Sequence, residues 1–462
     1  MLGDTIAAIS TPRGKGGVAL LRVSGPDAIA IAARVFVPRS GRPLCEASTR
    51  TAVYGSILAP DPDGQWRSVD DGLATVFRAP ASFTGEDTVE ICCHGGILLT
   101  ETVLTALLAA GARAAEAGEF TRRAFLNGKL GLSSAEALGN LLEAQTREQL
   151  ALAHSGLGGG LGARCEEIYG ELRHILASIY VRIDYPDEDL ADMSREEMIE
   201  AFGKCERSLA ALAATYRTGH AIAEGIPTVI CGRPNVGKSS LYNAIVGHDA
   251  AIVTEIEGTT RDVLTETASL GRVTLRLFDT AGLRATVDPV ERIGIARAED
   301  AMRRAELILA IFNGAEAPTD EDRALIAALS RSDAAVIAVI NKRDLGLADT
   351  SLYTETFAHC VTLSAAEGQG IDALAEAVEQ LFTDGKLDSR DGAILTNARQ
   401  HAAVIASLEA VRRALEALEN GAPIDMCCID AEEAMSALAE VDGREVSEDI
   451  VSEIFSHFCV GK

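Results

Sequence analysis

The apolar positions of the first 125 residues follow a mixture of strand-like and helix-like periods. Short apolar or alternating stretches predict strands at residues 5–11, 18–23, 72–78 and 88–93, and apolar residues spaced three and four apart predict helices at 27–35 and 97–110. The glycine-rich stretch between the first two strands is interpreted as a hairpin or a small-molecule loop. We therefore expect a small α/β domain over residues 1–125.

From residue 132 the apolar spacing becomes helical. Helices are predicted at 135–148, 166–183 and 194–220, and again near the end of the chain at 397–419, 431–441 and 447–458. Ser133 and Glu136 have the spacing of a capping box at the start of the first of these helices. A glycine cluster at 156–162 interrupts the helical pattern, and the acidic run 184–189 is interpreted as a solvated loop rather than a metal site.

Residues 225–384 alternate strand and helix at the period of a parallel sheet that is covered on both faces. Because helical stretches flank this region, the simplest architecture is a helical domain interrupted by an inserted α/β domain. The chain is thus expected to be multidomain, α/β plus all-α, with segments at 1–125, 126–222, 223–384 and 385–462.

Composition narrows the class of protein. The 462 residues correspond to about three domains, and neither a secretory start nor an apolar run near the ~20 residues of a membrane span is present. The ten cysteines contain no C-x-x-C pair, which favours reduced thiols in the cytoplasm. A net charge of −26 argues against a chain that grips nucleic acid mainly by itself, so an RNA partner would need a more basic protein.

A glycine loop follows a short, mostly apolar stretch at 228–231. The loop Gly232 to Gly237 ends in Lys238-Ser239 and fills every fixed position of G-x-x-x-x-G-K-[ST]. In such a loop backbone N–H groups surround a phosphate chain, the lysine reaches the β- and γ-phosphates, and the serine hydroxyl ligates Mg²⁺. The positive end of the next helix points at the same phosphates. This pattern predicts a nucleotide-binding loop rather than a chance glycine run.

Three further motifs follow in the order typical of guanine-nucleotide domains. Asp279-Thr280-Ala281-Gly282 predicts a loop that senses the γ-phosphate, with Asp279 in the Mg²⁺ shell. Asn341-Lys342-Arg343-Asp344 ends a strand, and the Asp344 carboxylate can accept two N–H groups that guanine offers and adenine lacks. Ser364-Ala365 ends another strand and would contact the guanine oxygen.

The expected GTP contacts come from these loops and from the stretch before Arg261, in which Thr260 would close on Mg²⁺. They are Asn235, Val236, Gly237, Lys238, Ser239, Ser240, Thr254, Glu255, Ile256, Glu257, Gly258, Thr259, Thr260, Asp279, Thr280, Ala281, Gly282, Asn341, Lys342, Asp344, Ser364 and Ala365.

The hydrolytic group is not the usual one. Leu283 stands where Ras-type domains have a glutamine that orients the attacking water, and no arginine finger is evident. The side-chain oxygen of Asn235 could bind a monovalent cation inside the phosphate loop. By spacing alone, Glu291 is either a carboxylate in the first turn of a helix or a group that holds water.

Motifs along nearly the whole chain resemble the MnmE (TrmE) family of tRNA-modifying GTPases. They are GRPNVGKSS, GTTRD, DTAGLR followed by VERIGI, NKRD, SFTGED, HGG, EFTRRAFLNGK and FCVGK. The GTPase motifs are shared with other bacterial GTPases such as Era, whereas the N-terminal motifs and the cysteine-containing tail are specific to this family. Three departures are FCVGK for the usual FCIGK, Asn313 where an acidic residue is common, and a Gly156 to Gly162 cluster that is richer in glycine than expected.

The resemblance implies an N-terminal α/β folate-binding and dimerising domain, a discontinuous helical domain and an inserted Ras-like P-loop GTPase domain. It further implies a homodimer that works with the FAD-containing flavoprotein MnmG, as a heterotetramer, on carbon 5 of the wobble uridine of certain tRNAs. The group added is of the aminomethyl or carboxymethylaminomethyl type. A tetrahydrofolate derivative (5,10-methylene-tetrahydrofolate, with a 5-formyl analogue) would supply the carbon, and GTP hydrolysis would depend on K⁺.

The resemblance also carries roles to particular residues. A K⁺ site would comprise Asn235, Thr254, Ile256 and Thr259, Ser239 and Thr260 would hold Mg²⁺, and Glu291 would be catalytic together with Lys238. Folate contacts would come from Arg22, Glu90, Lys129 and Lys462. Cys459 is either a nucleophile in one-carbon transfer or a small thiol packed near the folate pocket.

The sequence leaves two alternative functions open. One is an Era-type ribosome-assembly GTPase that acts as an RNA-binding timer, although such a protein would be expected to carry a basic RNA-binding module. The other is a folate-dependent one-carbon enzyme whose GTPase domain is only regulatory.

Overall fold

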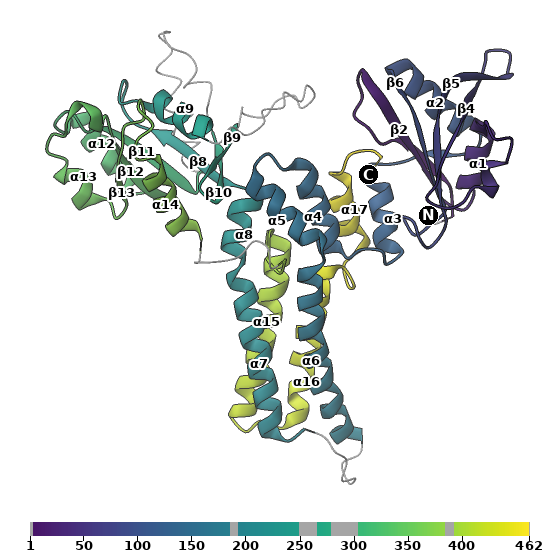
Figure 1. The fold of residues 1–462 in the computed structure, drawn as a ribbon. Helices are drawn as coiled ribbons and strands as arrows, with labels where there is room; N and C mark the ends of the chain where they lie inside the picture. Colours follow the sequence, from purple (N-terminus) through teal and green to yellow (C-terminus); the bar gives the residue numbers. More distant parts are fainter. Residues whose placement is uncertain (1–2, 185–192, 249–265, 279–303, 384–391, 462) are drawn as a thin grey trace. The chain divides into compact units, whose positions relative to one another are not determined.

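The computed structural model describes residues 3–184, 193–248, 266–278, 304–383 and 392–461 (Figure 1). The chain divides into two compact units. The first joins Met1–Glu136 to Asp442–Lys462, and the second is Ala137–Val441. The two ends of the chain therefore share one unit. The domain boundaries expected from the sequence at residues 125, 222 and 384 stay a prediction.

A seven-stranded sheet forms the body of the first unit, in the order β3-β4-β5-β6-β2-β1-β7. Its strands are β1 (Ile6–Ile9), β2 (Gly16–Ser24), β3 (Phe36–Pro38), β4 (Ala52–Pro60), β5 (Trp66–Phe77), β6 (Thr88–Gly95) and β7 (Arg113–Ala114). The pairing of β1 with β7 is parallel, and the other pairs of this sheet are antiparallel. Because β1 and β2 pair as antiparallel neighbours, the hairpin interpretation of residues 12–17 is confirmed.

Buried apolar residues alternate with polar residues along the strands, so that one face of this sheet is packed and the other is polar. Leu21 and Val23 of β2 are fully buried and belong to one core with α1 (Ala28–Val35) and α2 (Ile97–Ala109). Arg22 lies between them in sequence and so points to the opposite face. The strand β4 and the first half of β5 were missed by the sequence analysis, and in β5 half-buried charged residues such as Asp70 and Asp71 obscure the strand period.

The end of the chain returns to the beginning of this unit. Three helices, α3 (Glu119–Leu126), α4 (Leu132–Glu143) and α17 (Glu448–Ser456), meet in a small core that contains Leu132 and Phe455. After α17, Val460 pairs with Ala117 in an isolated bridge. Gly461 has a φ of 98°, and a Cβ atom there would lie 2.5 Å from the carbonyl oxygen of Ile9. The glycine is therefore required for the tail to lie against β1.

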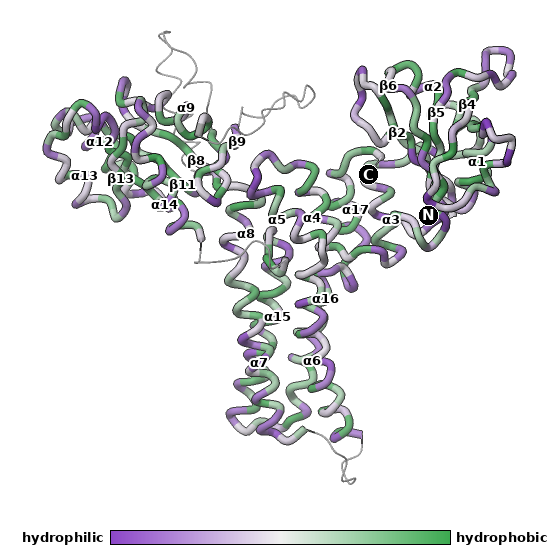
Figure 2. The backbone as a smooth tube through the Cα atoms, in the orientation of Figure 1, coloured by the Kyte–Doolittle hydropathy of each residue, from purple (hydrophilic) through white to green (hydrophobic). Residues whose placement is uncertain are grey.

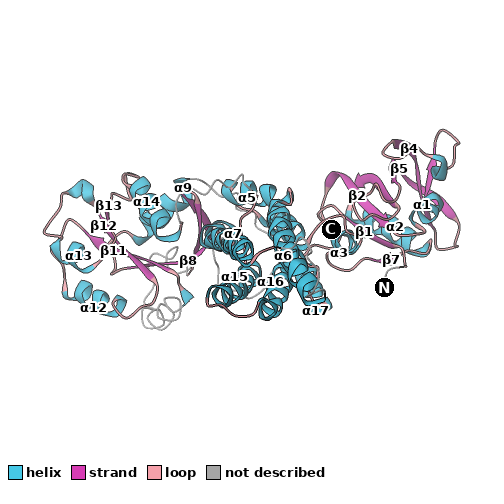
Figure 3. Ribbon diagram, turned by 90° about the horizontal axis from the view of Figure 1, so that it is seen from below, coloured by secondary structure: helices cyan, strands magenta, loops and turns pink. Residues whose placement is uncertain are grey.

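Six helices of different lengths form one part of the second unit. They are α5 (Arg147–Leu157), α6 (Gly160–Asp184), α7 (Arg195–Ala214), α8 (Tyr216–Ala223), α15 (Ala398–Glu419) and α16 (Cys427–Asp442). The short 3-10 turn η3 (Ile424–Met426) lies between α15 and α16, and a similar turn, η1 (Leu44–Glu46), belongs to the first unit. Figure 3 shows α6, α7, α15 and α16 side by side, and they share one apolar core. Along α7 and α15 hydrophobic and hydrophilic residues alternate with the helical turn (Figure 2), as expected for one buried stripe per helix.

Several helix ends differ from the sequence-based expectation. The capping box at Ser133 is wrong, because α4 begins at Leu132 and the Ser133 hydroxyl bonds to Asp442 instead (2.8 Å). The capping box actually lies at Thr146 and opens α5. The glycine cluster does separate two helices, but α6 starts as early as Gly160. The helix expected over 194–220 is divided between α7 and α8.

A six-stranded sheet forms the rest of the second unit, in the order β13-β12-β11-β8-β10-β9. Its strands are β8 (Ile226–Cys231), β9 (Glu266–Leu270), β10 (Val273–Leu277), β11 (Leu307–Asn313), β12 (Ala335–Asn341) and β13 (Cys360–Thr362). Its helices are α9 (Lys238–His248), α12 (Asp320–Leu329), α13 (Ser351–Thr356) and α14 (Ile371–Phe382), with the turn η2 (Arg343–Leu345).

The central strands of this sheet are parallel, and β9 pairs antiparallel with β10. Every residue of β11 is buried, and separate apolar cores lie on the two faces of the sheet. This confirms the prediction of a doubly covered parallel sheet inserted between helical segments. In the described residues, no helix is long and apolar enough to cross a membrane.

The close approach of α8 to the chain at 394–395 leads to a stability prediction. A Cβ atom at Gly219 would lie 2.1 Å from the carbonyl oxygen of Leu395, whereas one at Gly170 of α6 would meet nothing within 4 Å. Gly219→Ala should lower the free energy of unfolding by about 1–3 kcal/mol through overpacking. The matched Gly170→Ala should raise it by about 0.5–1 kcal/mol. Urea denaturation of both variants would check this, and equal shifts of the same sign would contradict it.

Candidate functional site

Two glycines in the loop between β8 and α9 occupy positions that exclude any side chain. A Cβ atom on Gly232 would lie 2.5 Å from the carbonyl oxygen of Ile311. Gly237 has a φ of 106°, and its Cβ atom would lie 2.2 Å from Nδ2 of Asn341. The loop is therefore pressed against the neighbouring strands, and it leads directly into the N-terminus of α9, where free N–H groups suit an anion.

Lys238 lies across the phosphate loop. Its Nζ donates to the carbonyl oxygens of Gly232 (2.8 Å) and Arg233 (2.9 Å). These are neutral acceptors, and a phosphate oxygen would give stronger, charge-assisted bonds. The ammonium group therefore lies at the loop, where phosphate oxygens of a bound nucleotide could replace the two carbonyl acceptors.

Asn341 joins three of the predicted motifs. Its Nδ2 donates to the carbonyl oxygen of Val236 in the phosphate loop (2.8 Å), and its Oδ1 accepts from the backbone N–H of Ala365 (2.9 Å). The side chain is buried, so both halves of the amide must be satisfied within the protein. One side chain therefore holds the phosphate loop beside the two loops expected to read the base.

Asp344 lies at the exposed end of this arrangement. Its Oδ1 accepts a hydrogen bond from the Ser364 hydroxyl (2.6 Å), and Ser364 itself is buried. Lys342 adopts a left-handed backbone with a φ of 65°, which turns the chain from β12 toward Asp344. The carboxylate is oriented by the protein but keeps a side open to solvent, as a base-reading group requires.

The remaining predicted nucleotide residues fall into two groups. Asn235, with a φ of 61°, is exposed at the tip of the loop, Val236 is buried, Ser239 is exposed and Ser240 is half-buried. The predicted switch and catalytic positions lie outside the described residues: Thr254, Glu255, Ile256, Glu257, Gly258, Thr259, Thr260, Asp279, Thr280, Ala281, Gly282, Leu283 and Glu291.

Arg233 belongs to the site but was missed by the sequence analysis. Its Nη2 bonds to Glu316 (2.5 Å), and its Nε lies 3.5 Å from the buried carboxylate of Asp322. Asp322 also closes the capping box of α12 with Thr319. The second residue of the phosphate loop is thus anchored to α12. No local sequence pattern predicts these contacts of Arg233, because Glu316 and Asp322 lie far from it in the sequence.

In the first unit, the predicted folate residues Arg22 and Glu90 lie directly opposite each other on β2 and β6. Nε and Nη2 of Arg22 both donate to Oε1 of Glu90, at 3.0 and 2.7 Å. The guanidinium also lies 5.5 Å from the ring of Phe83 and 5.6 Å from that of Phe120, within cation–π range. Phe83 is partly exposed and was not predicted. Arg22 and Glu90 therefore form one hydrogen-bonded pair, with the partly exposed ring of Phe83 beside the guanidinium.

The other predicted folate residues are less closely grouped. Lys129 is exposed, and its Nζ donates to the carbonyl oxygen of Pro80 (2.9 Å), at the start of the loop that carries Phe83. Cys459 is exposed in the tail, where its carbonyl oxygen accepts from the N–H of Gly118 (3.4 Å). Lys462 lies outside the described residues.

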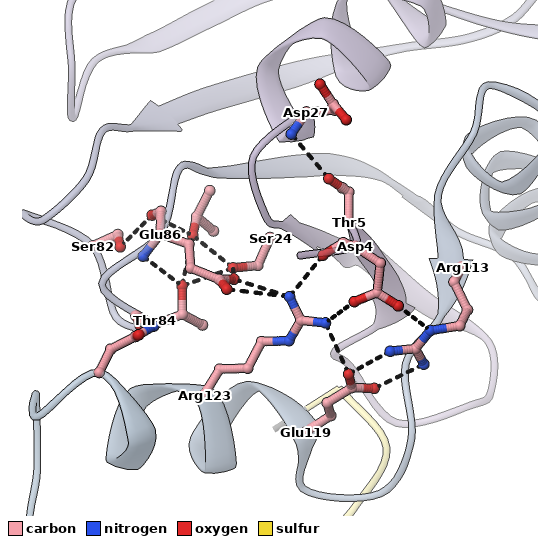
Figure 4. Close-up of polar contacts among 12 residues, drawn as sticks. Asp4, Thr5, Ser24, Asp27, Ser82, Thr84, Glu86, Arg113, Glu119 and Arg123 are labelled. Atoms are coloured by element: carbon pink, nitrogen blue, oxygen red, sulfur yellow. Dashed lines mark hydrogen bonds and ion pairs between the residues drawn. The ribbon is translucent and has the colours of Figure 1, made fainter. Parts of the chain in front are cut away.

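A buried charge network supports this region. Figure 4 shows Arg123 of α3 pointing toward Asp4, Glu86 and Glu119. It bonds to Asp4 at 2.6 Å, to Glu119 at 3.0 Å and to Glu86 at 3.2 Å, although only 3% of its side chain is exposed. Arg113 adds bonds to Asp4 (2.7 Å) and Glu119 (2.6 Å). The network joins α3, which carries Phe120, to the loop that carries Phe83.

The arginines hold the carboxylates of the network ionised. Hydrogen bonds from the Arg113 guanidinium, helped by Arg123, lower the pKa of Asp4 to about 2. Burial works to raise the pKa of Glu119, but the bonds from Arg113 and Arg123 outweigh it and leave that pKa lowered. Because folded pKa values lie below the unfolded ones, the stability they contribute is present above about pH 4 and is lost toward lower pH.

Comparison with known proteins extends over the whole chain. The family model described as the MnmE helical domain matches residues 132–459, and the one described as the GTP-binding protein TrmE N-terminus matches residues 5–129. The tRNA modification GTPase MnmE of Bacillus licheniformis is 42% identical over 99% of this chain and 100% of its own. Its counterpart in Symbiobacterium thermophilum is 44% identical over 99% of each chain. Among solved structures, the match to the G domain of the T. maritima FeoB iron transporter covers 33% of this chain and 96% of that chain, at 22% identity and a TM-score of 0.25.

The charge network generates a prediction for Arg123. Arg123→Gln leaves Glu86 without its arginine and leaves Asp4 and Glu119 with Arg113 alone, and it should lower the free energy of unfolding by about 3–5 kcal/mol at pH 7. The adjacent Arg122→Gln, which removes an arginine that has no ion pair among the described residues, should cost much less. Denaturation at pH 7 checks both variants. The Arg123→Gln deficit should shrink as Asp4 protonates between its unfolded pKa of 3.8 and its folded pKa of about 2. Equal stability of Arg123→Gln and wild type at pH 7 would contradict the role of the network.

Proposed function

The chain belongs to the MnmE family of tRNA modification GTPases, and from that premise we propose that it couples GTP hydrolysis to modification of tRNA. Its class of enzyme is that of a GTP hydrolase. The observation that carries the proposal is the double hydrogen bond of Asn341. These bonds hold the phosphate loop beside the loop at 364–365, and we propose that the nucleotide binds there, at the edge of the parallel sheet where nucleotides bind in this class of fold.

Guanine selection follows from the geometry around Asp344. A carboxylate accepts but does not donate, so it pairs with the two N–H groups that guanine presents. The Ser364 hydroxyl donates a hydrogen bond to Oδ1 of Asp344, and this bond holds the carboxylate in one orientation. The backbone N–H of Ala365 already donates to the Asn341 side chain. We therefore propose that other backbone groups of the same loop contact the guanine oxygen.

Cleavage of GTP requires groups that stabilise the charge developing between the β- and γ-phosphates. Lys238 would transfer its two hydrogen bonds from the loop carbonyls to phosphate oxygens. Ser239 and Thr260 would hold Mg²⁺, and Asn235 with Thr254, Ile256 and Thr259 would hold K⁺. When bound, these ions supply positive charge. Since Leu283 cannot orient water, Glu291 is proposed to hold the attacking water.

The N-terminal unit is proposed to bind the one-carbon donor of the reaction at carbon 5 of the wobble uridine. The donor is a tetrahydrofolate derivative, which supplies the carbon when bound. Arg22 and Glu90 form a half-buried polar pair beside the partly exposed ring of Phe83, and such a combination suits a flat heterocycle with donor and acceptor edges. Lys129 and Lys462 would take the carboxylates, and Cys459 would be either a nucleophile in the one-carbon transfer or a small thiol packed near the folate pocket.

Partners are proposed from charge and family together. With a net charge of −26, the chain by itself should bind tRNA weakly. We infer a cytoplasmic homodimer that meets tRNA mainly within a complex with the flavoprotein MnmG. The ribosome-assembly alternative is less favoured, because no basic RNA-binding module is evident in the sequence. The purely regulatory alternative is tested by supplying folate donor and tRNA without GTP.

The proposed function has a direct cellular test. Cells that lack this chain should lose the aminomethyl-type groups at carbon 5 of wobble uridines, as measured by mass spectrometry of their tRNA, and the wild-type gene should restore them. Asp344→Asn should not restore them, because an amide can no longer accept both guanine N–H groups. The purified variant should instead prefer xanthosine triphosphate in competition binding. Unchanged wobble uridines in the deletion strain would refute the proposal.

The proposed cation site makes a separate kinetic prediction. GTP turnover should be high in K⁺ and low in Na⁺ at equal ionic strength, because the charge replaces an arginine finger worth about 10³–10⁵ in rate. Asn235→Ala should remove the difference between the salts. Glu291→Ala should lose most turnover yet keep nucleotide binding and K⁺-stimulated dimerisation. Equal wild-type rates in both salts would rule out the cation mechanism.

A further inference from the structure

Two carboxylates hold the side chain of Arg233, the second residue of the phosphate loop. Its Nη2 donates a hydrogen bond to Glu316 at 2.5 Å, and its Nε lies 3.5 Å from Oδ1 of Asp322. Only 19% of the Arg233 side chain is exposed, so water and salt screen these ion pairs less than they screen pairs on the open surface. The phosphate loop is therefore tied to two points of the chain that follows β11.

Asp322 is a rigid attachment point for this arginine. Its side chain is 1% exposed, and its Oδ2 accepts hydrogen bonds from the backbone N–H (2.9 Å) and the hydroxyl (2.8 Å) of Thr319. The same carboxylate closes the capping box that opens α12. A buried carboxylate needs a counter-charge, and the guanidinium of Arg233 provides it. The ion pair thus joins the phosphate loop to the N-terminus of α12.

Glu316 connects the phosphate loop with the loop that is proposed to read the base. It follows β11, and Gly314 in the same turn donates its N–H to the carbonyl oxygen of Asn341 (2.8 Å). The hydrogen bond from Arg233, to which the positive charge of Lys342 adds, lowers the pKa of Glu316. Glu316 is therefore a carboxylate at neutral pH and is attracted to one cation from each of the two loops.

The backbone of Arg233 holds the lysine of the phosphate loop. Its carbonyl oxygen accepts a hydrogen bond from Nζ of Lys238 at 2.9 Å, and the carbonyl oxygen of Gly232 accepts another at 2.8 Å. Because the side chain and this carbonyl belong to one residue, anchoring the side chain also restricts the direction of the carbonyl. A loop that is already ordered loses less conformational freedom when it binds a phosphate chain, and this raises its affinity.

We propose that Arg233 is a positioning residue for GTP: held by Glu316 and Asp322, it orders the phosphate loop before the nucleotide binds. The inference rests on the proposed nucleotide site. Arg233 acts through the loop backbone and Lys238 and touches neither the nucleotide nor the attacking water. The ordered loop is needed by the bound substrate and by the transition state alike. Its loss should therefore raise the KM for GTP more than it lowers kcat.

Binding of a fluorescent GDP and of a fluorescent, non-hydrolysable GTP analogue to the full-length protein tests the idea. Glu316→Gln should weaken both by about threefold, the effect expected of a partly exposed ion pair. Arg233→Gln should weaken both by roughly tenfold, because the loop then loses both attachment points. The double variant should bind no more weakly than Arg233→Gln, because Glu316 acts through Arg233 and the two losses are not additive.

Two further variants separate position from charge. Arg331→Gln removes the same charge from an exposed turn after α12 and should bind both nucleotides as the wild type does. Arg233→Lys keeps the charge, but one ammonium group cannot reproduce the fork that reaches both carboxylates. Its affinity should lie between those of the wild type and Arg233→Gln.

Circular dichroism shows whether each variant is folded at the temperature of the binding measurement. If Arg233→Gln is not folded, Glu316→Gln decides the question, because its side chain is 56% exposed and its loss leaves the buried ion pair with Asp322 in place. Wild-type affinity of Glu316→Gln for both nucleotides would overturn the inference, and so would additive losses in the double variant. If the wild type itself bound neither nucleotide, the proposed nucleotide site would be refuted instead.

Discussion

The side-chain amide of Asn341 is the contact on which the nucleotide site depends. It donates to the phosphate loop and accepts from the Ser364-Ala365 loop, so loops from three different strand ends share one buried anchor. A buried amide that loses either partner carries a desolvation cost of about 1–3 kcal/mol, which makes the arrangement close to all-or-none. Gly237 is part of the same constraint, because only its missing side chain leaves room for the Asn341 amide.

In the first unit, ion pairs of a buried arginine hold distant segments together, as the Asn341 amide does in the second unit. Arg123 is nearly completely buried among three carboxylates, a combination that stabilises a protein only when every charge is matched. The network ties α3 to the loop at 82–86 and so keeps Phe83 and Phe120 on the two sides of Arg22. Arg123 therefore holds α3 to the rest of the first unit through its ion pairs.

The two units place their functional groups by the same physical means. In each, a glycine permits a backbone approach that a side chain would block, as at Gly237 and at Gly461. A polar side chain then bridges elements that are distant in sequence, as Asn341 and Arg123 do. Exposed groups with specific chemistry, such as Asp344 and Lys129, lie at the edge of these anchored frames, where solvent and ligand can reach them.

Local pattern predicted most of the architecture of this protein and its class of enzyme. Periodicity predicted the inserted parallel sheet and most of its flanking helices, and the spacing in Gly232 to Ser239 and Asn341 to Asp344 predicted guanine-nucleotide loops, because each motif is short and contiguous. Strand β4, the division of α7 from α8 and the loss of the Ser133 cap were decided by tertiary contacts, such as the bond of Ser133 to Asp442. The Arg233 anchor and the rings around Arg22 likewise could not be predicted from the sequence. Each depends on residues that are remote in the chain and become neighbours only through folding, so no local pattern can record them.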